Sequence, residues 1–237
     1  MKTTIFKSET RGSANYGWLK TRYSFSFGEY YDAERIHYGV LRVLNDDEVA
    51  AGQGFGMHPH DNMEIITIPL EGKLQHRDNM GNSSVIEKGE IQVMSAGTGI
   101  FHSEFNPDSE KPVKLLQIWL FPDKKNHSPR YQQQKLDFES MRNRLHLILT
   151  PQPSDTTVYI HQNAWFSMAL TTSKQMWDYN LYKPGNGVYI FVIEGSLNIG
   201  SISLNRRDGI GLSDLESVTM EAEKDSMILL MEFPMHG

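Results

Sequence analysis

GQGFGMHPHDNMEIITIPLEG, residues 52–72, is the stretch that decides how this chain folds. Its second half contains Ile65–Leu70, an apolar run of the length and β-branched composition that are typical of a buried strand. Its first half places His58 and His60 two residues apart. Side chains at i and i+2 of a β-strand point to the same face, so the spacing predicts two imidazoles aimed at one point.

A second stretch, GEIQVMSAGTGIFHSEFN at residues 89–106, repeats this arrangement with His102 and Glu104. If the two strands lie side by side, three imidazoles and one carboxylate converge, which is a ligand set for a divalent metal. Glycines at 52, 54 and 56 precede the first pair and permit bulges or close backbone approach beside a pocket. A lone His-x-His motif is weak evidence, whereas two ligand pairs beside glycine-rich turns are much stronger.

The composition limits the classes of protein to which the chain can belong. With 237 residues, 39% of them hydrophobic, we expect a globular fold of one long β domain or two small ones. A net charge of −6 and the lack of a densely basic stretch argue against direct nucleic-acid binding. The chain has no cysteine, so any metal ligands are nitrogen or oxygen, and a cytoplasmic location is expected. We expect no membrane contact, because no apolar run approaches roughly 20 residues and the N-terminus lacks a signal-peptide core.

The pattern along the chain predicts an all-β fold with few short helices. Short apolar runs bounded by turn residues are expected to be strands: Tyr38–Val43, Glu64–Leu70, Ile91–Met94, Leu115–Phe121, Val188–Ile193 and Met227–Phe233. Residues 79–82, Asn-Met-Gly-Asn, predict a hairpin turn. The polar segment from Pro122 to Arg144 has no sustained apolar face and is interpreted as a linker, with one helical turn around Asp137–Met141.

A weak internal repeat indicates two modules. Residues 65–74, IITIPLEGKL, resemble residues 188–197, VYIFVIEGSL. Aligning Gly72 with Gly195 places Leu181 opposite His58 and Lys183 opposite His60, so the second copy keeps the strand but not the ligands. We therefore expect a metal-binding module at residues 1–122, a linker at 123–144 and a module without ligands at 145–237.

The glycine-bounded blocks resemble the two motifs of the cupin barrel, with Ser95 where proline is common. Together, GFGMHPHDNMEIITIPLEG, HRDNMGN, GEIQVMSAGTGIFHSE, QIWLFP and SPRYQQ resemble the pirin family, and in particular its bacterial quercetinase-like members. The segment NYGWLKTRYSFSFGEYYD fits the same family. The resemblance covers essentially the whole chain, is most specific over residues 11–134, and implies two tandem cupin barrels (double-stranded β-helix or jelly-roll) of which the second is degenerate.

The carboxylate ligand has two candidates. Strand parity is compatible with both, since His60 to Glu64 and His102 to Glu104 are each even steps. Most cupins take the carboxylate from the first motif, which here is Glu64. Resemblance to pirins selects Glu104 instead, so that His58, His60, His102 and Glu104 are the expected ligands and Glu64 is expected to orient an imidazole or line the pocket.

The ligand types alone allow Fe, Mn, Co, Ni, Cu or Zn. Resemblance to pirins favours one Fe(II) ion and a dioxygenase that cleaves quercetin-like flavonols with O2 and releases carbon monoxide, with Glu104 accepting the substrate proton. Two alternatives stay open: a metal-bearing regulatory protein that binds a protein partner, and an oxygenase that acts on another enolic or aromatic metabolite.

The remaining candidate residues are expected to be structural. His76 and Asp78 form another i,i+2 pair, but they flank the turn at 79–82 and are expected to serve it. His127 is expected to be solvated, and His37, His146 and His161 to be structural. The apolar residues around the ligands are expected to form barrel core and in part the pocket: Met57, Met63, Met94 and Phe101.

Overall fold

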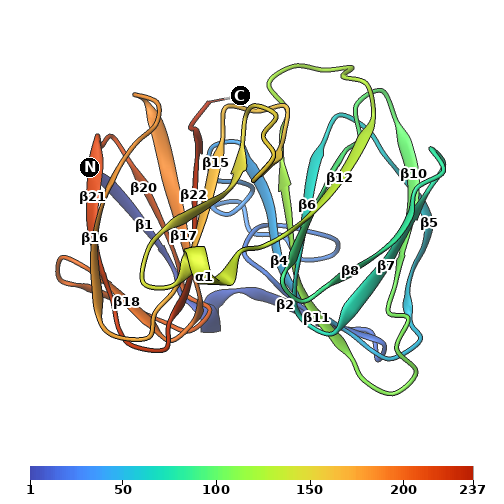
Figure 1. Cartoon of the computed structure of the whole chain (residues 1–237), viewed down its shortest axis with the longest axis horizontal. Helices are drawn as coiled ribbons and strands as arrows, with labels where there is room; N and C mark the ends of the chain where they lie inside the picture. Colours follow the sequence, from blue (N-terminus) through green and yellow to red (C-terminus); the bar gives the residue numbers. More distant parts are fainter. Residues whose placement is uncertain (237) are drawn as a thin grey trace.

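Two β-barrels lie side by side in the computed structural model, which describes residues 1–236 (Figure 1). Each barrel is a sandwich of one seven-stranded and one four-stranded sheet. Neighbouring strands pair antiparallel, except that β13 and β14 are parallel. The predicted all-β fold of two barrels is confirmed.

In the first barrel, the seven-stranded sheet has the order β12-β9-β6-β11-β4-β3-β2 and the four-stranded sheet has the order β5-β10-β7-β8. Their strands are β2 (Gly12–Asn15), β3 (Leu19–Tyr23), β4 (Leu41–Val49), β5 (Gly54–His60), β6 (Glu64–Glu71), β7 (Lys73–Asp78), β8 (Ser83–Glu87), β9 (Glu90–Ser95), β10 (Ile100–Phe105), β11 (Val113–Leu120) and β12 (Arg130–Lys135).

In the second barrel, the orders are β1-β20-β17-β22-β15-β13-β14 and β16-β21-β18-β19. Their strands are β1 (Lys2–Phe6), β13 (His146–Thr150), β14 (Val158–Tyr159), β15 (Trp165–Leu170), β16 (Gln175–Asn180), β17 (Asn186–Glu194), β18 (Ser196–Ile199), β19 (Ile202–Asn205), β20 (Gly209–Ser213), β21 (Ser217–Ala222) and β22 (Met227–Pro234). The helical elements are the 3-10 turn η1 (Ser8–Thr10) and α1 (Phe138–Met141), which lies where the sequence predicts a helical turn and is capped by Asp137. Among the described residues, no helix has the length and apolar character that crossing a membrane requires.

The central strands of the large sheets are buried on both faces. On β6, Ile66 and Ile68 belong to a core cluster that also contains Phe166 and Phe191 of the second barrel. Ile65 belongs instead to a separate cluster inside the first barrel. Two buried faces explain why these strands are continuous apolar runs in the sequence rather than alternating ones.

The internal repeat corresponds to equivalent strands. β6 and β17 both occupy the third position of their seven-stranded sheets, and each is followed by a glycine with positive φ. Gly72 has φ +75° and Gly195 has φ +76°, a conformation that side-chain-bearing residues rarely adopt. The predicted turn at residues 79–82 is also confirmed, since Gly81 has φ +94° and the turn joins the paired strands β7 and β8.

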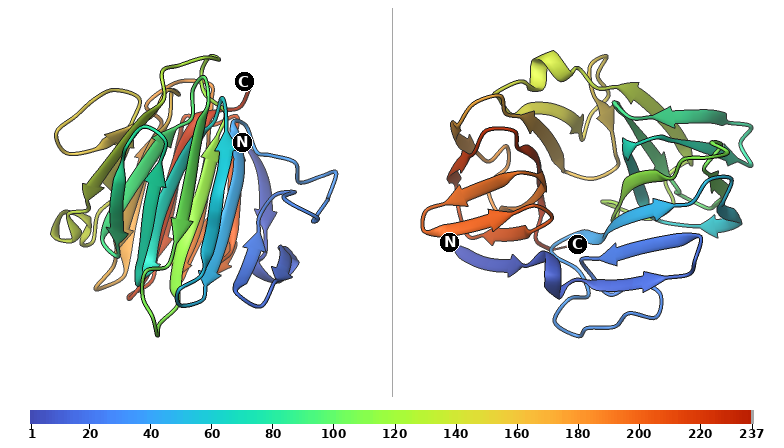
Figure 2. Two further views of the ribbon diagram at one scale, coloured as in Figure 1. Left: turned by 90° about the vertical axis from the view of Figure 1, so that its right-hand side faces the viewer. Right: turned by 90° about the horizontal axis from the view of Figure 1, so that it is seen from below.

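Two strands lie outside the module to which the sequence assigns their residues. β12 lies within the expected linker but pairs with β9 of the first barrel, and β1 pairs with β20 of the second. Figure 2 shows β1, in dark blue, alongside the orange strands of the second barrel. The sequence of β12, RYQQQK, is polar and its side chains are mostly half-buried, so it shows no apolar pattern from which a strand could be predicted.

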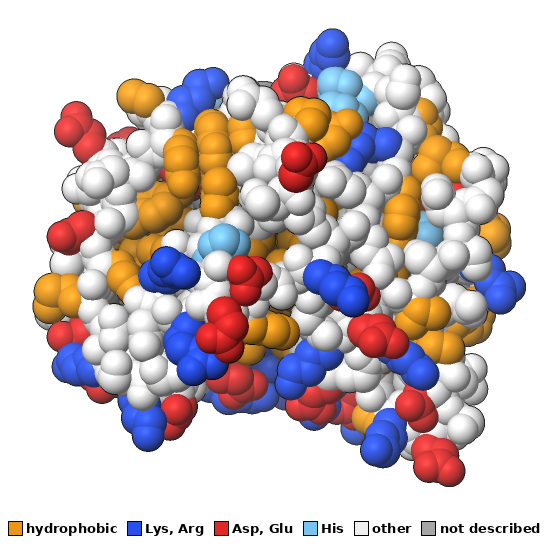
Figure 3. Space-filling view, viewed as in Figure 1, with side chains coloured by type: hydrophobic (Ala, Val, Ile, Leu, Met, Phe, Trp, Pro, Cys, Tyr) orange, Lys and Arg blue, Asp and Glu red, His pale blue; other side chains and the backbone are white. Residues whose placement is uncertain are grey.

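Charged side chains of both signs are interspersed over the face in Figure 3, most densely along its lower edge. That face therefore presents no continuous block of positive charge.

Candidate metal centre

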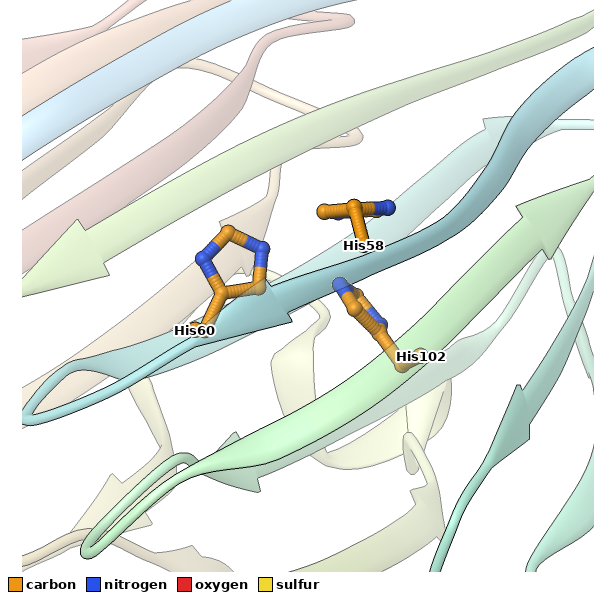
Figure 4. A group of neighbouring side chains, drawn as sticks. All are labelled: His58, His60 and His102. Atoms are coloured by element: carbon orange, nitrogen blue, oxygen red, sulfur yellow. The ribbon is translucent and has the colours of Figure 1, made fainter.

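Strands β5 and β10 bring the three predicted histidines together. The strands pair antiparallel with His58 opposite His102 and His60 opposite Ile100. One ring nitrogen from each of His58, His60 and His102 lies within 4.8 Å of the other two. Figure 4 shows the three rings converging above these strands, with centroids 4.4 to 4.9 Å apart.

The donor set suits a divalent metal. His102 is 2% exposed, and neither of its ring nitrogens has a hydrogen-bond partner. Burial, followed by the charge of His58, lowers the pKa of His102 to about 2 and that of His60 to about 4, so both imidazoles are neutral near pH 7. His58 donates from Nδ1 to the Gly56 carbonyl at 2.7 Å, which leaves Nε2 available. Neutral, converging imidazoles with free nitrogens are what such a cation binds.

Glu104 is held in a buried network below the histidines. It is 4% exposed, and its Oε2 accepts a 2.9 Å hydrogen bond from Nε2 of Gln117. The Thr67 hydroxyl lies 3.5 Å from Oε1 of Glu104 and 3.1 Å from Oε1 of Gln117. Burial, opposed by the Gln117 hydrogen bond and aided by the charge of Asp47, raises the pKa of Glu104 to about 7. The carboxyl group therefore titrates near neutral pH.

His76 joins this part of the site, although the sequence interpretation assigned it to the turn. Ligand atoms of His76, His102 and Glu104 lie within 4.8 Å of one another. β7 pairs with β10 so that Asp78 lies opposite His102 and His76 opposite Glu104. The i,i+2 spacing on β7 is the same signal that identified the other pairs, and it could have found this one.

Asp78 has two roles. Its Oδ2 lies 3.1 Å from Nε2 of the fully buried His76, while its Oδ1 accepts hydrogen bonds from the backbone of Met80 and Asn82. The expectation that Asp78 serves the turn is met, but the same carboxylate also fixes the orientation of His76.

Glu64 lies on the other face of its strand. Its neighbours Ile65 and Thr67 face the barrel interior, so Glu64 points toward the second barrel. There its Oε2 accepts a 2.7 Å hydrogen bond from Ser95, and its Oε1 lies 3.3 Å from Nδ1 of His161. The imidazole that Glu64 orients is thus not one of the converging three. Strand parity fails here because β5 ends at His60 and β6 begins at Glu64, with a turn between them.

His127 and His161 are not solitary side chains. Their rings stack with centroids 3.9 Å apart and an interplanar angle of 7°. Nε2 of His127 lies 2.6 Å from Oδ1 of Asp123, and the His127 side chain is only 14% exposed. The prediction of a solvated His127 is wrong, because stacking against His161 covers the ring.

A cavity of about 240 Å³ opens over the three histidines. Its wall is mostly aromatic and apolar and contains no lysine or arginine: Leu19, Thr21, Tyr23, Phe27, Asn45, Asp47, Phe55, His58, His60, Ile65, His102, Glu104, Gln117 and Trp119. The prediction of a pocket inside this barrel is met. Met94 and Met63 pack in the nearby core, but Met57 and Phe101 are 58% and 49% exposed, because they alternate with the inward-facing histidines.

The second barrel is filled by apolar side chains instead. Within residues 1–236, the groups of three or more potential metal ligands all lie in the first barrel. The carboxylate of Glu232 is fully buried and accepts hydrogen bonds from the backbone N–H groups of Tyr182 and Lys183. In the repeat alignment Lys183 stands opposite His60. The position that holds this histidine in the first barrel is therefore taken, in the second barrel, by a loop whose backbone binds Glu232.

Comparisons with known proteins agree with this architecture. Residues 6–120 match the Pirin family model, and residues 147–233 match the model of the quercetinase C-terminal cupin domain. The chain is 39% identical over 229 residues to a protein of Escherichia coli K12 named quercetin 2,3-dioxygenase, covering 96% of this chain and 97% of that one. The chain belongs to the pirin family. A further relative of this pirin, the putative quercetin 2,3-dioxygenase PA1210 of Pseudomonas aeruginosa, is 40% identical and covers 93% of this chain and 95% of its own.

Solved structures share the fold of this pirin. The crystal structure of YhhW from Escherichia coli has a TM-score of 0.93 and 37% identity, with complete coverage of both chains. A second structure, bacterial pirin YhhW in complex with nickel(II), has a TM-score of 0.92 and 36% identity, covering 98% of this chain and 99% of that one. The fold expected from the cupin motifs is therefore confirmed.

Proposed function

We propose that this pirin is a metal-dependent dioxygenase that cleaves quercetin-like flavonols with O2 and releases carbon monoxide. The observation that carries the proposal is the convergence of three imidazoles at an aromatic-walled cavity. The relatives named quercetin 2,3-dioxygenase support the same reaction class.

In this proposal His58, His60, His102 and Glu104 hold one divalent metal ion. We propose Fe(II), and the nickel complex of the Escherichia coli relative supports a divalent cation at the family's site. When bound, the cation supplies a Lewis acid that lowers the pKa of the flavonol 3-hydroxyl.

Glu104 is suited to accept the proton of that hydroxyl. Gln117 occupies Oε2 at 2.9 Å, whereas Oε1 has only the distant Thr67 hydroxyl at 3.5 Å. The more weakly bonded Oε1 is therefore the oxygen that takes the proton, and Gln117 keeps the carboxyl group oriented while it does so.

The walls of the cavity position the planar ring system. Phe27, Phe55 and Trp119 provide flat apolar surfaces, and Trp119 also packs edge-on against His60 at a centroid distance of 4.8 Å. Enclosure by these side chains limits the access of water to the reacting ring.

The test is aerobic incubation of Fe(II)-loaded protein with quercetin, following loss of the flavonol absorbance and release of carbon monoxide. We expect turnover by the wild type and by Lys183→Ala, whose substitution lies in the second barrel, and none by His102→Ala. Absence of turnover with Fe, Mn, Co, Ni and Cu alike would refute the proposed reaction.

A further inference from the structure

The wall of the cavity that faces the histidines contains three buried polar side chains to which the proposed reaction assigns no role: Thr21 on β3, and Asn45 and Asp47 on β4. Asn45 and Asp47 lie on β4 of the seven-stranded sheet, whereas the histidines lie on the four-stranded sheet. Both residues line the same cavity and are only 3% and 6% exposed.

These side chains carry unused hydrogen-bonding capacity. Oδ1 of Asn45 and Oδ1 of Asp47 are buried and have no hydrogen-bond partner in the protein. Their neighbour Gln117, which pairs in register with Asn45, is by contrast bonded to both Glu104 and Thr67. Oγ1 of Thr21, which pairs in register with Asp47, is likewise buried without a partner. Buried polar atoms without partners reduce stability, so three in one corner of a binding cavity indicate a ligand that completes them.

We propose that Asn45 and Asp47 form a second recognition site in this cavity, which binds hydroxyl groups of the substrate on the side away from the metal. The inference rests on the proposed function, since it concerns how the same substrate is oriented. It makes Asn45 and Asp47 positioning residues for the ring that bears those hydroxyls.

The chemistry of the wall specifies a class of substrate. Carboxyl and amide oxygens accept hydrogen bonds, as phenolic hydroxyls require. The lining contains no lysine or arginine to neutralise a carboxylate or a phosphate, and it does contain Asp47 and Glu104. The cavity therefore favours neutral, polyhydroxylated aromatic enols over acidic metabolites.

Isosteric variants separate this role from a structural one. In Asn45→Leu and Asp47→Leu the apolar side chain keeps the volume and removes a polar group that has no partner, so the melting temperature should be unchanged or raised. Glu48→Gln is the matched control, since Glu48 is the next residue on β4 and forms an ion pair with Lys20 on the outer face. A purely structural role predicts a lower melting temperature for the two leucine variants.

The decisive measurement compares two ligands with the same chelating group. Quercetin carries four hydroxyls besides the 3-hydroxyl, and 3-hydroxyflavone carries none. Anaerobic titration of Fe(II)-loaded protein, followed by the shift in flavonol absorbance, gives both dissociation constants. We expect each leucine variant to weaken quercetin binding about fivefold, the effect of one hydrogen bond, and to leave 3-hydroxyflavone binding unchanged.

Equal effects on the two ligands, no effect on either, or no binding of quercetin to the wild type would overturn the inference. Selective weakening of quercetin binding without turnover in air would support the recognition site and refute the dioxygenase proposal. Turnover in air, combined with equal effects of the leucine substitutions on quercetin and 3-hydroxyflavone binding, would support the dioxygenase proposal and refute the recognition site. The two failures are therefore distinguishable.

Discussion

Gln117 and Glu104 join the two walls of the first barrel. Nε2 of Gln117, on the seven-stranded sheet, donates a 2.9 Å hydrogen bond to Oε2 of Glu104, on the four-stranded sheet. Thr67 on β6 in turn donates a hydrogen bond to Gln117 on β11. The orientation of the proposed carboxylate ligand therefore depends on the seven-stranded sheet, on which none of the proposed ligands lies.

Substitution of Gln117 should therefore weaken metal binding. In Gln117→Leu, Glu104 loses its closest donor and its fixed orientation, and partners of this kind typically contribute 10- to 100-fold in metal affinity or activity, so we expect a loss of roughly that size. Isothermal titration with Ni(II) and Fe(II) measures it. Gln175→Leu, on β16 of the second barrel, is the control, and equal affinities for the two variants would contradict the prediction.

The choice between Glu104 and Glu64 can be tested with one pair of variants. Glu104→Gln should lower metal affinity about tenfold or more, because it removes the negative charge of the proposed carboxylate ligand. Glu64→Gln should leave metal affinity unchanged, since that carboxylate contacts Ser95 and His161. It should instead lower the free energy of unfolding by about 1–3 kcal/mol, as expected for a perturbed buried hydrogen bond. A loss of metal in Glu64→Gln would reverse the assignment.

The two ligand pairs were predictable because each lies within a single strand, where alternation fixes the facing of side chains. The position of Glu64 was not, because the turn around Asn62, at φ +47°, separates it from His60 and resets the alternation. His76 and Asp78 show the same spacing and were assigned to the turn, because the pairing of β7 with β10 that brings His76 to the site is a contact between strands, which a single sequence does not specify.

The same limit applies to the fold. The apolar strands β6 and β17 were visible as continuous runs because both of their faces are buried. β12 and β1 were not, since each is an edge strand whose side chains are mostly exposed or half-buried and form no apolar run.

The three converging histidines, as the proposed ligands, should be required for metal binding, and the aligned positions of the second barrel should not. We expect His60→Ala or His102→Ala to lower the metal content well below one ion per chain, because each variant leaves only two of the three converging imidazoles beside Glu104. Lys183→Ala, at the position aligned with His60, should retain one ion. Elemental analysis of the purified variants checks both, and two tightly bound ions in the wild type would contradict a single metal centre.

Asp47 should make stability depend on pH. Burial raises its pKa from 3.8 to about 7, so between these values the folded protein keeps a proton that the unfolded chain has released. The folded state then binds more protons, and Asp47 destabilises it increasingly as pH rises toward 7, with no further change above. The advantage of Asp47→Asn in unfolding free energy should therefore grow between pH 5 and pH 7 at up to about 1.4 kcal/mol per unit, and then level off. Urea unfolding of the metal-free proteins measures this, and a difference independent of pH would exclude it.

Glu232 should be a stability determinant of the second barrel with no influence on the metal. Its Oε2 accepts from the Tyr179 hydroxyl at 2.8 Å and the Tyr182 N–H at 2.9 Å, while its Oε1 accepts from the Lys183 N–H at 3.0 Å and the Asn186 amide at 2.9 Å. In Glu232→Gln, whichever oxygen becomes an NH2 group, one backbone N–H loses its acceptor and faces another donor.

We expect this change to cost about 1–3 kcal/mol or more in unfolding free energy. Tyr179→Phe, which removes a single donor, should cost about 1 kcal/mol and serves as the milder comparison. Denaturant unfolding and metal analysis on the same samples check both parts of the prediction. Loss of metal from Glu232→Gln while the first barrel remains folded would show that the two barrels are coupled through β22, and that the second barrel is more than a structural copy of the first.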